Sequence, residues 1–365
     1  MISLLQKGNN NGNSFRRAAS RGRATRCGPT CRCRPDTRRM FERNEREGTR
    51  GGDLIKFTSA IFPGDTYVLD YVAQKKGFFT DHGLDVSYLM PASGSAAVQL
   101  LAAGQVQGWT TAPSVVYGAA EQGQPIAVAG MIKSLAPYNL IVKNNASWAD
   151  ANAPLDQRLK SLSGKTIGVS GLGAGTDLAL RAALSSAHVP ESSVNRIGVG
   201  TTLAGLGQLQ GGVIDGYVEF TGSGTKLIES KLPGRIYIDL VGKDQPLPAQ
   251  TLADLAVAVN TTWAKANPKG MADWLAALQQ ADDWVKDPAN LNEAAQIVSD
   301  ASYKGQYLDQ VKSALGALVG KLKDSSGFTV TRPRVDAQLS ILHSLGVLKT
   351  DKVTFDSVVL PSAQG

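Results

Sequence analysis

The chain has 365 residues, 42% of them apolar and 19% charged, which is typical of one or two globular domains. No apolar run reaches the roughly 18–20 residues that a membrane-spanning helix needs. The formal net charge of +7 arises in residues 1–52, where 13 basic residues accompany four acidic ones. From Asp53 onward, 25 basic and 27 acidic residues remain of the 38 and 31 in the chain, so the basic excess does not indicate a nucleic-acid-binding fold.

Residues 1–52 show almost no apolar periodicity, and we expect a disordered basic arm there. The only cysteines, Cys27, Cys31 and Cys33, lie in this arm, which excludes a disulfide framework from the rest of the chain. The arm is interpreted as a nucleic-acid-binding tail, as a metal-binding segment without a nearby histidine, or as a stretch foreign to the native protein. We favour the third interpretation. The apolar run MISLL is too short for the core of a secretory signal.

The next part of the chain alternates between strands and helices. An alternating strand over 53–58 is followed by a loop and by helical apolar spacing that ends at Gly77. Ser93 or Ser95 is expected to cap the second helix, and Pro113 to separate a third strand from a third helix. Further strands are predicted at 83–90, 125–132 and 138–143. This alternation predicts a mostly parallel sheet covered by helices on both faces.

The pattern restarts after residue 160. Strands are predicted at 165–170, 195–200, 214–220 and 234–240, and helices at 175–189, 201–212 and from 222. The sequence therefore predicts a second α/β unit of similar size. Beyond about residue 255 the chain is predicted to be helical, with segments over 268–287, 291–301, 305–322 and 334–348, before it closes with VTFDSVVLP.

The segment LSGKTIGVSGLGAGTD at 162–177 contains parts of two nucleotide motifs, and neither is complete. A phosphate-binding loop would require glycine at position 159, which is Leu159, and its GKT would have to follow a strand instead of preceding one. A dinucleotide fingerprint would require glycine at position 176, which is Thr176. The segment is better interpreted as a strand followed by a glycine-rich turn.

This turn is predicted to expose backbone amides at the start of a helix. Gly171, Gly173 and Gly175 let the N–H groups and the dipole of the following helix face an anion or another acceptor; a plain glycine-rich turn is the alternative. Similar turns over 92–95 and 110–114 precede helices in the first unit. Since ligands of open α/β sheets bind at the carboxyl ends of strands, we expect a cleft of small hydroxyls and backbone amides between two domains.

Four segments carry a resemblance to a known family: AQKKGFFTDHGLDVSYL, GSAAVQLLAAGQVQGWTTAP, LSGKTIGVSGLGAGTDLALRAAL and LGQLQGGVIDGYVEF. Residues 53–365 resemble the periplasmic solute-binding proteins of ABC importers for nitrate, sulfonates and taurine, a group that includes binders of thiamine-pyrimidine precursors. The elements LLAAGQVQG and LGQLQGGVIDG recur one per lobe in that family. This chain has Gln107 where the first of them usually carries aspartate, and Asp215 in the second.

The resemblance implies a type II periplasmic-binding-protein fold with two lobes joined by two crossovers. Lobe one would comprise 53–142 plus 253–365, and lobe two 143–252. The cleft would close on the solute by a hinge motion, a population shift driven by contacts to both lobes. The resemblance also implies a periplasmic monomer that docks on an ABC permease in the membrane and binds neither nucleic acid nor a cofactor.

Position in the predicted elements selects the candidate ligand-binding residues. They are Phe62, Pro63, Gly64, Asp65, Tyr67, Ser93, Gly94, Ser95, Thr111, Ala112, Ser114, Gly173, Ala174, Gly175, Thr176, Glu219 and Phe220. Serine and threonine at helix starts are as often plain caps, and Glu219 could instead be a hinge or salt-bridge residue. Asp65 and Glu219, with no basic residue in these loops, favour a larger organic solute over bare nitrate. The aromatic rings among these candidates could stack on such a solute, although core packing is the commoner role.

The sequence offers no sign of catalysis. The three histidines are isolated, and no nucleophile–base pair or metal-ligand spacing is visible, so we expect neither an enzyme nor a metal site. Relatives that make the thiamine pyrimidine carry a histidine and a cysteine-rich motif, and this chain has no cysteine after residue 52. A sensory binding module of the same fold is the other alternative, which the sequence does not separate from a transport component.

Overall fold

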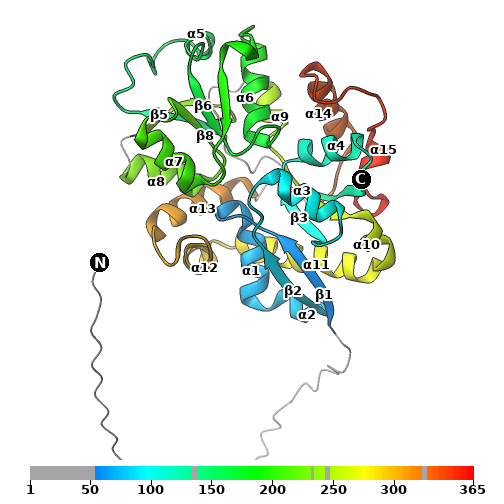
Figure 1. Cartoon of the computed structure of the whole chain (residues 1–365). Coiled ribbons are helices and arrows are strands. Elements are labelled where there is room, and N and C mark those ends of the chain that lie inside the picture. The colour runs from blue at the N-terminus through cyan, green and yellow to red at the C-terminus, as the bar shows by residue number, and fades with distance from the viewer. Residues whose placement is uncertain (1–53, 133–137, 232–233, 243–246, 323–326) are drawn as a thin grey trace, which may run out of the picture. The chain divides into compact units, whose positions relative to one another are not determined.

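The computed structural model describes residues 54–132, 138–231, 234–242, 247–322 and 327–365. The predicted basic arm, with its three cysteines, lies outside these residues. Figure 1 shows the described part as two groups of strands, each accompanied by helices. None of the helices in these ranges combines the length and the apolar character needed to cross a bilayer.

The first sheet has five strands in the order β2-β1-β3-β10-β4. Its strands are β1 (Ile55–Ala60), β2 (Leu84–Leu89), β3 (Gly108–Thr111), β4 (Ile126–Ile132) and β10 (Leu255–Asn260). Strand β1 pairs in parallel with β2 and β3, whereas β10 pairs antiparallel with β3 and β4. Every residue of β4 and β10 is buried, as expected for strands covered on both faces.

The second sheet repeats this arrangement in the order β7-β6-β8-β5-β9. Its strands are β5 (Asn139–Lys143), β6 (Thr166–Val169), β7 (Asn195–Gly198), β8 (Gly216–Glu219) and β9 (Gly234–Asp239). Strand β6 is parallel to β7 and β8, and β5 is antiparallel to β8 and β9. The predicted two-lobed α/β fold is confirmed, although each sheet is mixed because one strand runs against the other four.

In each sheet, the antiparallel strand is the first one that the chain forms after it crosses over from the other sheet. Strand β5 follows β4 along the chain, and β10 follows β9, so each passage ends in a strand placed one position from the sheet edge. The prediction of helices beyond residue 255 was wrong for Leu255–Asn260, which form β10. The segment LAVAVN has five consecutive apolar residues, too few for its periodicity to distinguish a buried strand from a helix.

The sheet to which each strand belongs indicates where the chain passes from one lobe to the other. Because β5 belongs to the second sheet, we propose that the first passage between lobes precedes Asn139, so the predicted limit after residue 142 falls inside β5. Helix α13 (Leu308–Leu322), in the tail predicted for lobe one, packs on α8 (Gly222–Lys231) of the second sheet.

The helices follow the predicted apolar spacing. Helix α1 (Val68–Lys76) ends at Gly77, whose φ of 79° is the left-handed conformation that glycine adopts without strain. The other helices before β10 are α2 (Phe78–Asp81), α3 (Gly94–Ala102), α4 (Pro113–Glu121), α5 (Leu155–Lys160), α6 (Gly175–Ser186), α7 (Thr202–Gly211) and α9 (Leu247–Thr251). Those after it are α10 (Thr261–Ala266), α11 (Pro268–Lys286), α12 (Leu291–Tyr303), α14 (Arg332–Ser344) and α15 (Phe355–Val358).

Helix α11 closes the core beneath the first sheet. Its Trp274 is fully buried, with its ring centroid 4.6 Å from that of Phe57 on β1. Gly108, at the start of β3, leaves room for both rings, because a β-carbon there would lie 2.3 Å from the Trp274 ring and 2.6 Å from the Phe57 ring. The aromatic core therefore requires glycine at this position.

We predict that Gly108→Ala lowers the free energy of unfolding by about 1–3 kcal/mol, because two rigid buried rings must move to admit the methyl group. Gly207→Ala is the matched control, since a β-carbon there meets nothing within 4 Å in the middle of α7. The control should raise stability by up to about 1 kcal/mol. Chemical denaturation measures both, and equal effects of the two substitutions would contradict the packing argument.

Candidate functional site

A cavity of about 680 Å³ lies where the carboxyl ends of the strands of both sheets meet. The loops after β1, β2 and β3 line it from the first sheet, and those after β6, β7 and β8 from the second. Its volume falls within the range of small-molecule sites, and strand carboxyl ends are where open α/β sheets bind ligands. The predicted cleft is thus present as a cavity.

Most of the predicted residues come together in this cavity. Those that line it are Phe62, Pro63, Tyr67, Ser93, Gly94, Ser95, Thr111, Ala112, Gly173, Ala174, Gly175, Thr176 and Phe220. Gly64, Asp65, Ser114 and Glu219 do not line it. Each of these four is buried elsewhere, close to the cavity wall.

The glycine-rich turn after β6 is held by its own side chains. The Thr176 hydroxyl accepts from the N–H of Ser170 at 2.9 Å and bonds the Ser170 hydroxyl at 2.8 Å. The Asp177 carboxylate accepts from the N–H of Gly173 at 2.9 Å and forms an ion pair with Arg196. Gly173 has a φ of 79°, which a side chain would strain. The turn is therefore fixed by contacts within the protein.

The helices that begin at the cavity differ in how their N-termini are capped. Thr201, which lines the cavity, caps α7 with its hydroxyl. Helix α3 is capped by Ser93, whose hydroxyl accepts from the N–H of Ala96 at 3.2 Å, so the expectation of Ser93 or Ser95 as its N-cap is confirmed for Ser93.

Helices α4 and α6 have alanine at the N-cap, Ala112 and Ala174, and no side chain caps either one. Alanine is a poor N-cap, so no side chain accepts from the first N–H groups of α6 at the cavity. In α4 the first residue, Pro113, has no N–H and Val115 donates to the Ala112 carbonyl at 3.0 Å, which leaves the N–H of Ser114.

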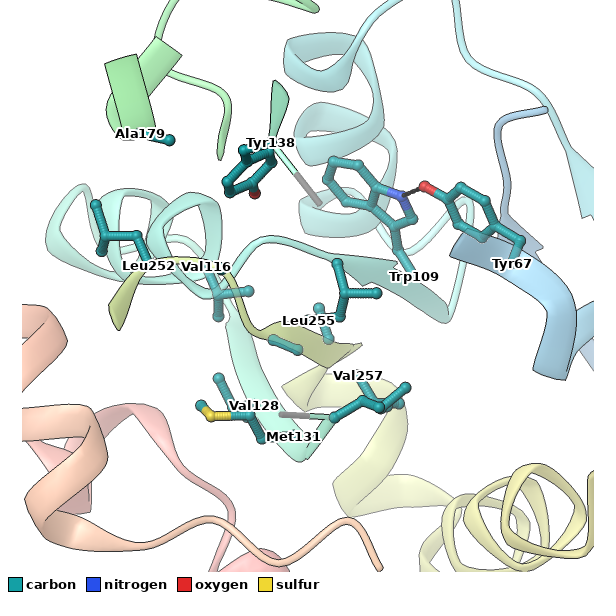
Figure 2. Packing of buried hydrophobic residues seen from close by; sticks show 14 of the residues in the cluster. Tyr67, Trp109, Val116, Val128, Met131, Tyr138, Ala179, Leu252, Leu255 and Val257 are labelled. Atoms are coloured by element: carbon teal, nitrogen blue, oxygen red, sulfur yellow. Dashed lines mark hydrogen bonds between the residues drawn. The ribbon is translucent and has the colours of Figure 1, made fainter. Parts of the chain in front are cut away.

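Aromatic rings form one wall of the cavity. The indole N–H of Trp109 donates to the Tyr67 hydroxyl at 3.2 Å, drawn as a dashed line in Figure 2. The ring centroid of Phe62 lies 6.0 Å from that of Trp109 and 6.4 Å from that of Tyr67. Because the indole N–H is occupied, Trp109 offers a solute its apolar surface.

Asp65 binds the other lobe instead of the cavity. Asp65 lies in the loop after β1 of the first sheet. Its carboxylate accepts hydrogen bonds from the N–H of Gly222 at 3.2 Å and the N–H of Ser223 at 3.0 Å. Both donors lie at the start of α8, a helix that accompanies the second sheet. The Ser223 hydroxyl donates to the same carboxylate at 2.5 Å. These three donors make Asp65 a helix cap that joins the two lobes, which explains why it is buried away from the solute space.

Glu219 is fully buried at the end of β8, behind the cavity wall. Its Oε1 accepts from the N–H groups of Phe220 at 2.8 Å and Thr221 at 2.7 Å, and from the hydroxyls of Thr221 at 3.0 Å and Thr202 at 3.1 Å. Its Oε2 has no partner among the described residues. Burial raises the pKa of Glu219 to about 7, and the same cause raises the pKa of Asp70 to about 7. Glu219 thus holds the backbone that carries Phe220.

The remaining two predicted residues pack beside the wall. Gly64 has a φ of 141°, and a β-carbon there would lie 2.7 Å from Cγ2 of Thr221. Its N–H donates to the Ser302 hydroxyl at 2.9 Å. Ser114 lies in the first turn of α4, and its buried hydroxyl has no partner among the described residues. Sequence position located the correct loops but not the direction of each side chain.

The cavity also contains polar and aromatic residues that were not among the sequence candidates. They include Thr66, Gln99, Trp109, Thr110, Gln122, Gln124, Tyr138, Ser170 and Thr201. Within the described part of the chain, no aspartate, glutamate, lysine, arginine or histidine lines this space, and no group of three or more potential metal ligands occurs. The lining therefore consists of hydroxyls, amides, backbone and apolar surface.

A family model described as NMT1/THI5 like matches residues 66–290, more than half of the chain. The nitrate/nitrite binding protein NrtA of Synechococcus elongatus is 37% identical over 60 residues, a stretch that covers 16% of this chain and only 14% of that protein.

Solved structures share the fold at low sequence identity. A protein of Bordetella bronchiseptica RB50 has a TM-score of 0.65 at 23% identity, covering 86% of this chain and 95% of that one. The alkanesulfonate-binding protein SsuA of Xanthomonas axonopodis pv. citri, bound to MOPS, has a TM-score of 0.64 at 11% identity, covering 86% and 98%. The desulfurization enzyme DSZB also shares the fold, with a TM-score of 0.58 at 14% identity over 84% and 96%. These likenesses show the fold alone.

We predict that Asp65→Ala lowers the free energy of unfolding by about 2 kcal/mol, because three donors at the start of α8, two of them buried, lose their acceptor. Asp85→Ala, an exposed aspartate on β2, is the matched control and should change stability by less than about 0.5 kcal/mol. Urea denaturation compares the two. An Asp65 effect no larger than the control would refute the role of Asp65 as a cap between lobes.

The raised pKa of Glu219 predicts a loss of stability with rising pH. Between about pH 4.5 and 7 the folded protein keeps this proton while the unfolded chain has released it, so the free energy of unfolding falls by about 3 kcal/mol across that window. Glu219→Gln keeps one acceptor oxygen and cannot ionise. The variant should lose less stability over this window, with Asp70 supplying the remaining slope; an unchanged pH profile would contradict the assignment.

Proposed function

Because the chain belongs to the NMT1/THI5-like family, we propose that it is the solute-binding component of an ABC-type importer. It would capture a small organic solute in the cavity and deliver it to a permease in the membrane. The observation that carries this proposal is the cavity itself, which is lined by the loops after three strands of each sheet. Relatives named for nitrate/nitrite and alkanesulfonate binding support it.

The cavity lining favours a sulfonate-like oxyacid with an organic body. The uncapped starts of α4 and α6 supply N–H donors, and helix N-termini bind anions without a cationic side chain. Nitrate would fill only a small part of 680 Å³. Taurine carries an ammonium group, and none of the described lining residues is an acid that could pair with it. Asp65 and Glu219, which the sequence suggested for solute selection, act outside the cavity.

Hinge closure would couple capture to transport. A solute in this position touches residues of both sheets, so it would favour arrangements in which the lobes are close. We propose a periplasmic monomer whose closed form docks on the permease. A sensory binding module would use the same step, and the proteins that recognise the closed form would separate the two roles.

We also propose that the solute leaves unchanged. The hydroxyls in the cavity lack a histidine, lysine or carboxylate beside them among the described lining residues, and such a base is what activates a serine or threonine for catalysis. The shared fold of the desulfurization enzyme makes this a point to test directly.

We predict that a saturating oxyacid solute raises the melting temperature by several degrees, since ligand at about 100 times its dissociation constant adds about 2.7 kcal/mol. Thermal melts with benzenesulfonate, ethanesulfonate, taurine and nitrate measure this, and X-ray scattering should show a smaller radius of gyration with the bound solute. Mass spectrometry of the solute after incubation is the control for turnover. The proposal fails if no solute stabilises the protein, or if the solute is consumed.

A further inference from the structure

One buried polar group that lines the cavity has no hydrogen-bond partner among the described residues. Tyr138 precedes β5, is 3% exposed and lines the cavity, and its hydroxyl makes no hydrogen bond with any described residue. Buried hydroxyls usually have a partner, so one directed into a cavity indicates a group supplied from outside. Burial, together with the nearby charge of Asp254, raises the pKa of Tyr138 above its ordinary value, so the phenol keeps its proton and donates.

The Tyr138 hydroxyl lies where the two uncapped helices meet. A β-carbon at Gly175, the first residue of α6, would be 2.2 Å from this hydroxyl and 2.8 Å from Cβ of Ala112, the N-cap of α4. Glycine at this position therefore lets the phenol, α4 and α6 converge. Each helix start carries about half an elementary charge, so the pair balances one negative charge without a basic side chain.

The organic body of such a solute also needs an apolar surface, and the aromatic wall of the cavity provides one. Trp109 and Phe62 contribute rings from the first sheet, and Phe220 contributes one from the second. The Trp109 N–H is already bonded to Tyr67, so this wall presents ring surface to a solute. Stacking on such rings suits a flat body more than a short alkyl chain.

We propose that Tyr138 and the starts of α4 and α6 bind the head group of a monoanionic aryl oxyacid, such as an arenesulfonate, whose ring packs on the aromatic wall. This assignment rests on the proposed solute-binding function and specifies its ligand. Tyr138 is then a specificity-determining residue that contacts the solute. It is also the residue at which the chain enters the second sheet, so the bound head group contacts both lobes.

Calorimetric titration of the full chain with benzenesulfonate tests the ligand class. Three analogues each change one property: ethanesulfonate lacks the ring, methyl phenyl sulfone lacks the charge, and phenyl phosphate carries a second charge above its second pKa. We expect benzenesulfonate to bind at least 10-fold more tightly than each analogue at pH 8. An analogue that equals or exceeds benzenesulfonate would overturn the class. Failure of all four probes to bind the wild-type protein would count against the proposed function as well.

Tyr138→Phe tests the residue, with Tyr237→Phe as the matched control. The Tyr237 hydroxyl is bonded to Ser161 at 2.9 Å, outside the cavity. Loss of a hydrogen bond to a charged group predicts about 10- to 100-fold weaker benzenesulfonate binding by Tyr138→Phe. Its melting temperature without solute should not fall, because the Tyr138 hydroxyl makes no hydrogen bond with the described residues. Tyr237→Phe should show the reverse, a lower melting temperature and unchanged affinity.

Gly175→Ala provides a second and independent variant. Its methyl group would occupy the space of the Tyr138 hydroxyl, so benzenesulfonate binding should weaken at least 10-fold while the aromatic wall stays intact. If wild type binds benzenesulfonate and both variants bind it with unchanged affinity, the assignment of Tyr138 is overturned and the proposed solute-binding function stands.

Discussion

The two lobes are held in register by a carboxylate of one sheet that caps a helix of the other. Asp65 accepts three hydrogen bonds from Gly222 and Ser223 at the start of α8, and it does so within a few residues of Phe62, which lines the cavity. The same short loop therefore supplies both a cavity wall and a contact between the lobes. A motion that opens the cavity must pivot near this cap or break it, because a buried carboxylate that loses three donors is costly.

The absence of a side-chain N-cap on two of its helices gives the cavity its hydrogen-bond donors. Helix α3 has a serine cap, whereas α4 and α6 begin at Ala112 and Ala174, whose side chains cannot accept a hydrogen bond from the first N–H groups. In a helix that faces only solvent, water would take these groups. Here they lie at a cavity that also holds the Tyr138 phenol, which has no partner among the described residues, and this combination of donors distinguishes the site from an ordinary group of loops.

The α/β fold and the loops that line the cavity could be predicted from the sequence, because glycine-rich turns and apolar periodicity are local signals. The strand-turn-helix order located the loops at 92–95, 110–114 and 173–176, and all three line the cavity in part. The roles of Asp65 and Glu219 could not be predicted, since a loop carboxylate looks the same whether it meets a solute or a helix from another lobe. Tyr138 was missed because it begins a predicted strand, over 138–143, where the sequence does not distinguish a tyrosine that faces a cavity from one that packs in the core.

The position of β10 has a consequence for how the chain assembles. All five strands of the second sheet lie between Asn139 and Asp239, so that sheet is continuous in sequence and can form once its own segment is available. The first sheet cannot, because β3 and β4 are joined only through β10, which begins at Leu255. During synthesis the sheet that is encoded first is therefore completed last, and its exposed strand edges must persist until the second sheet has left the ribosome.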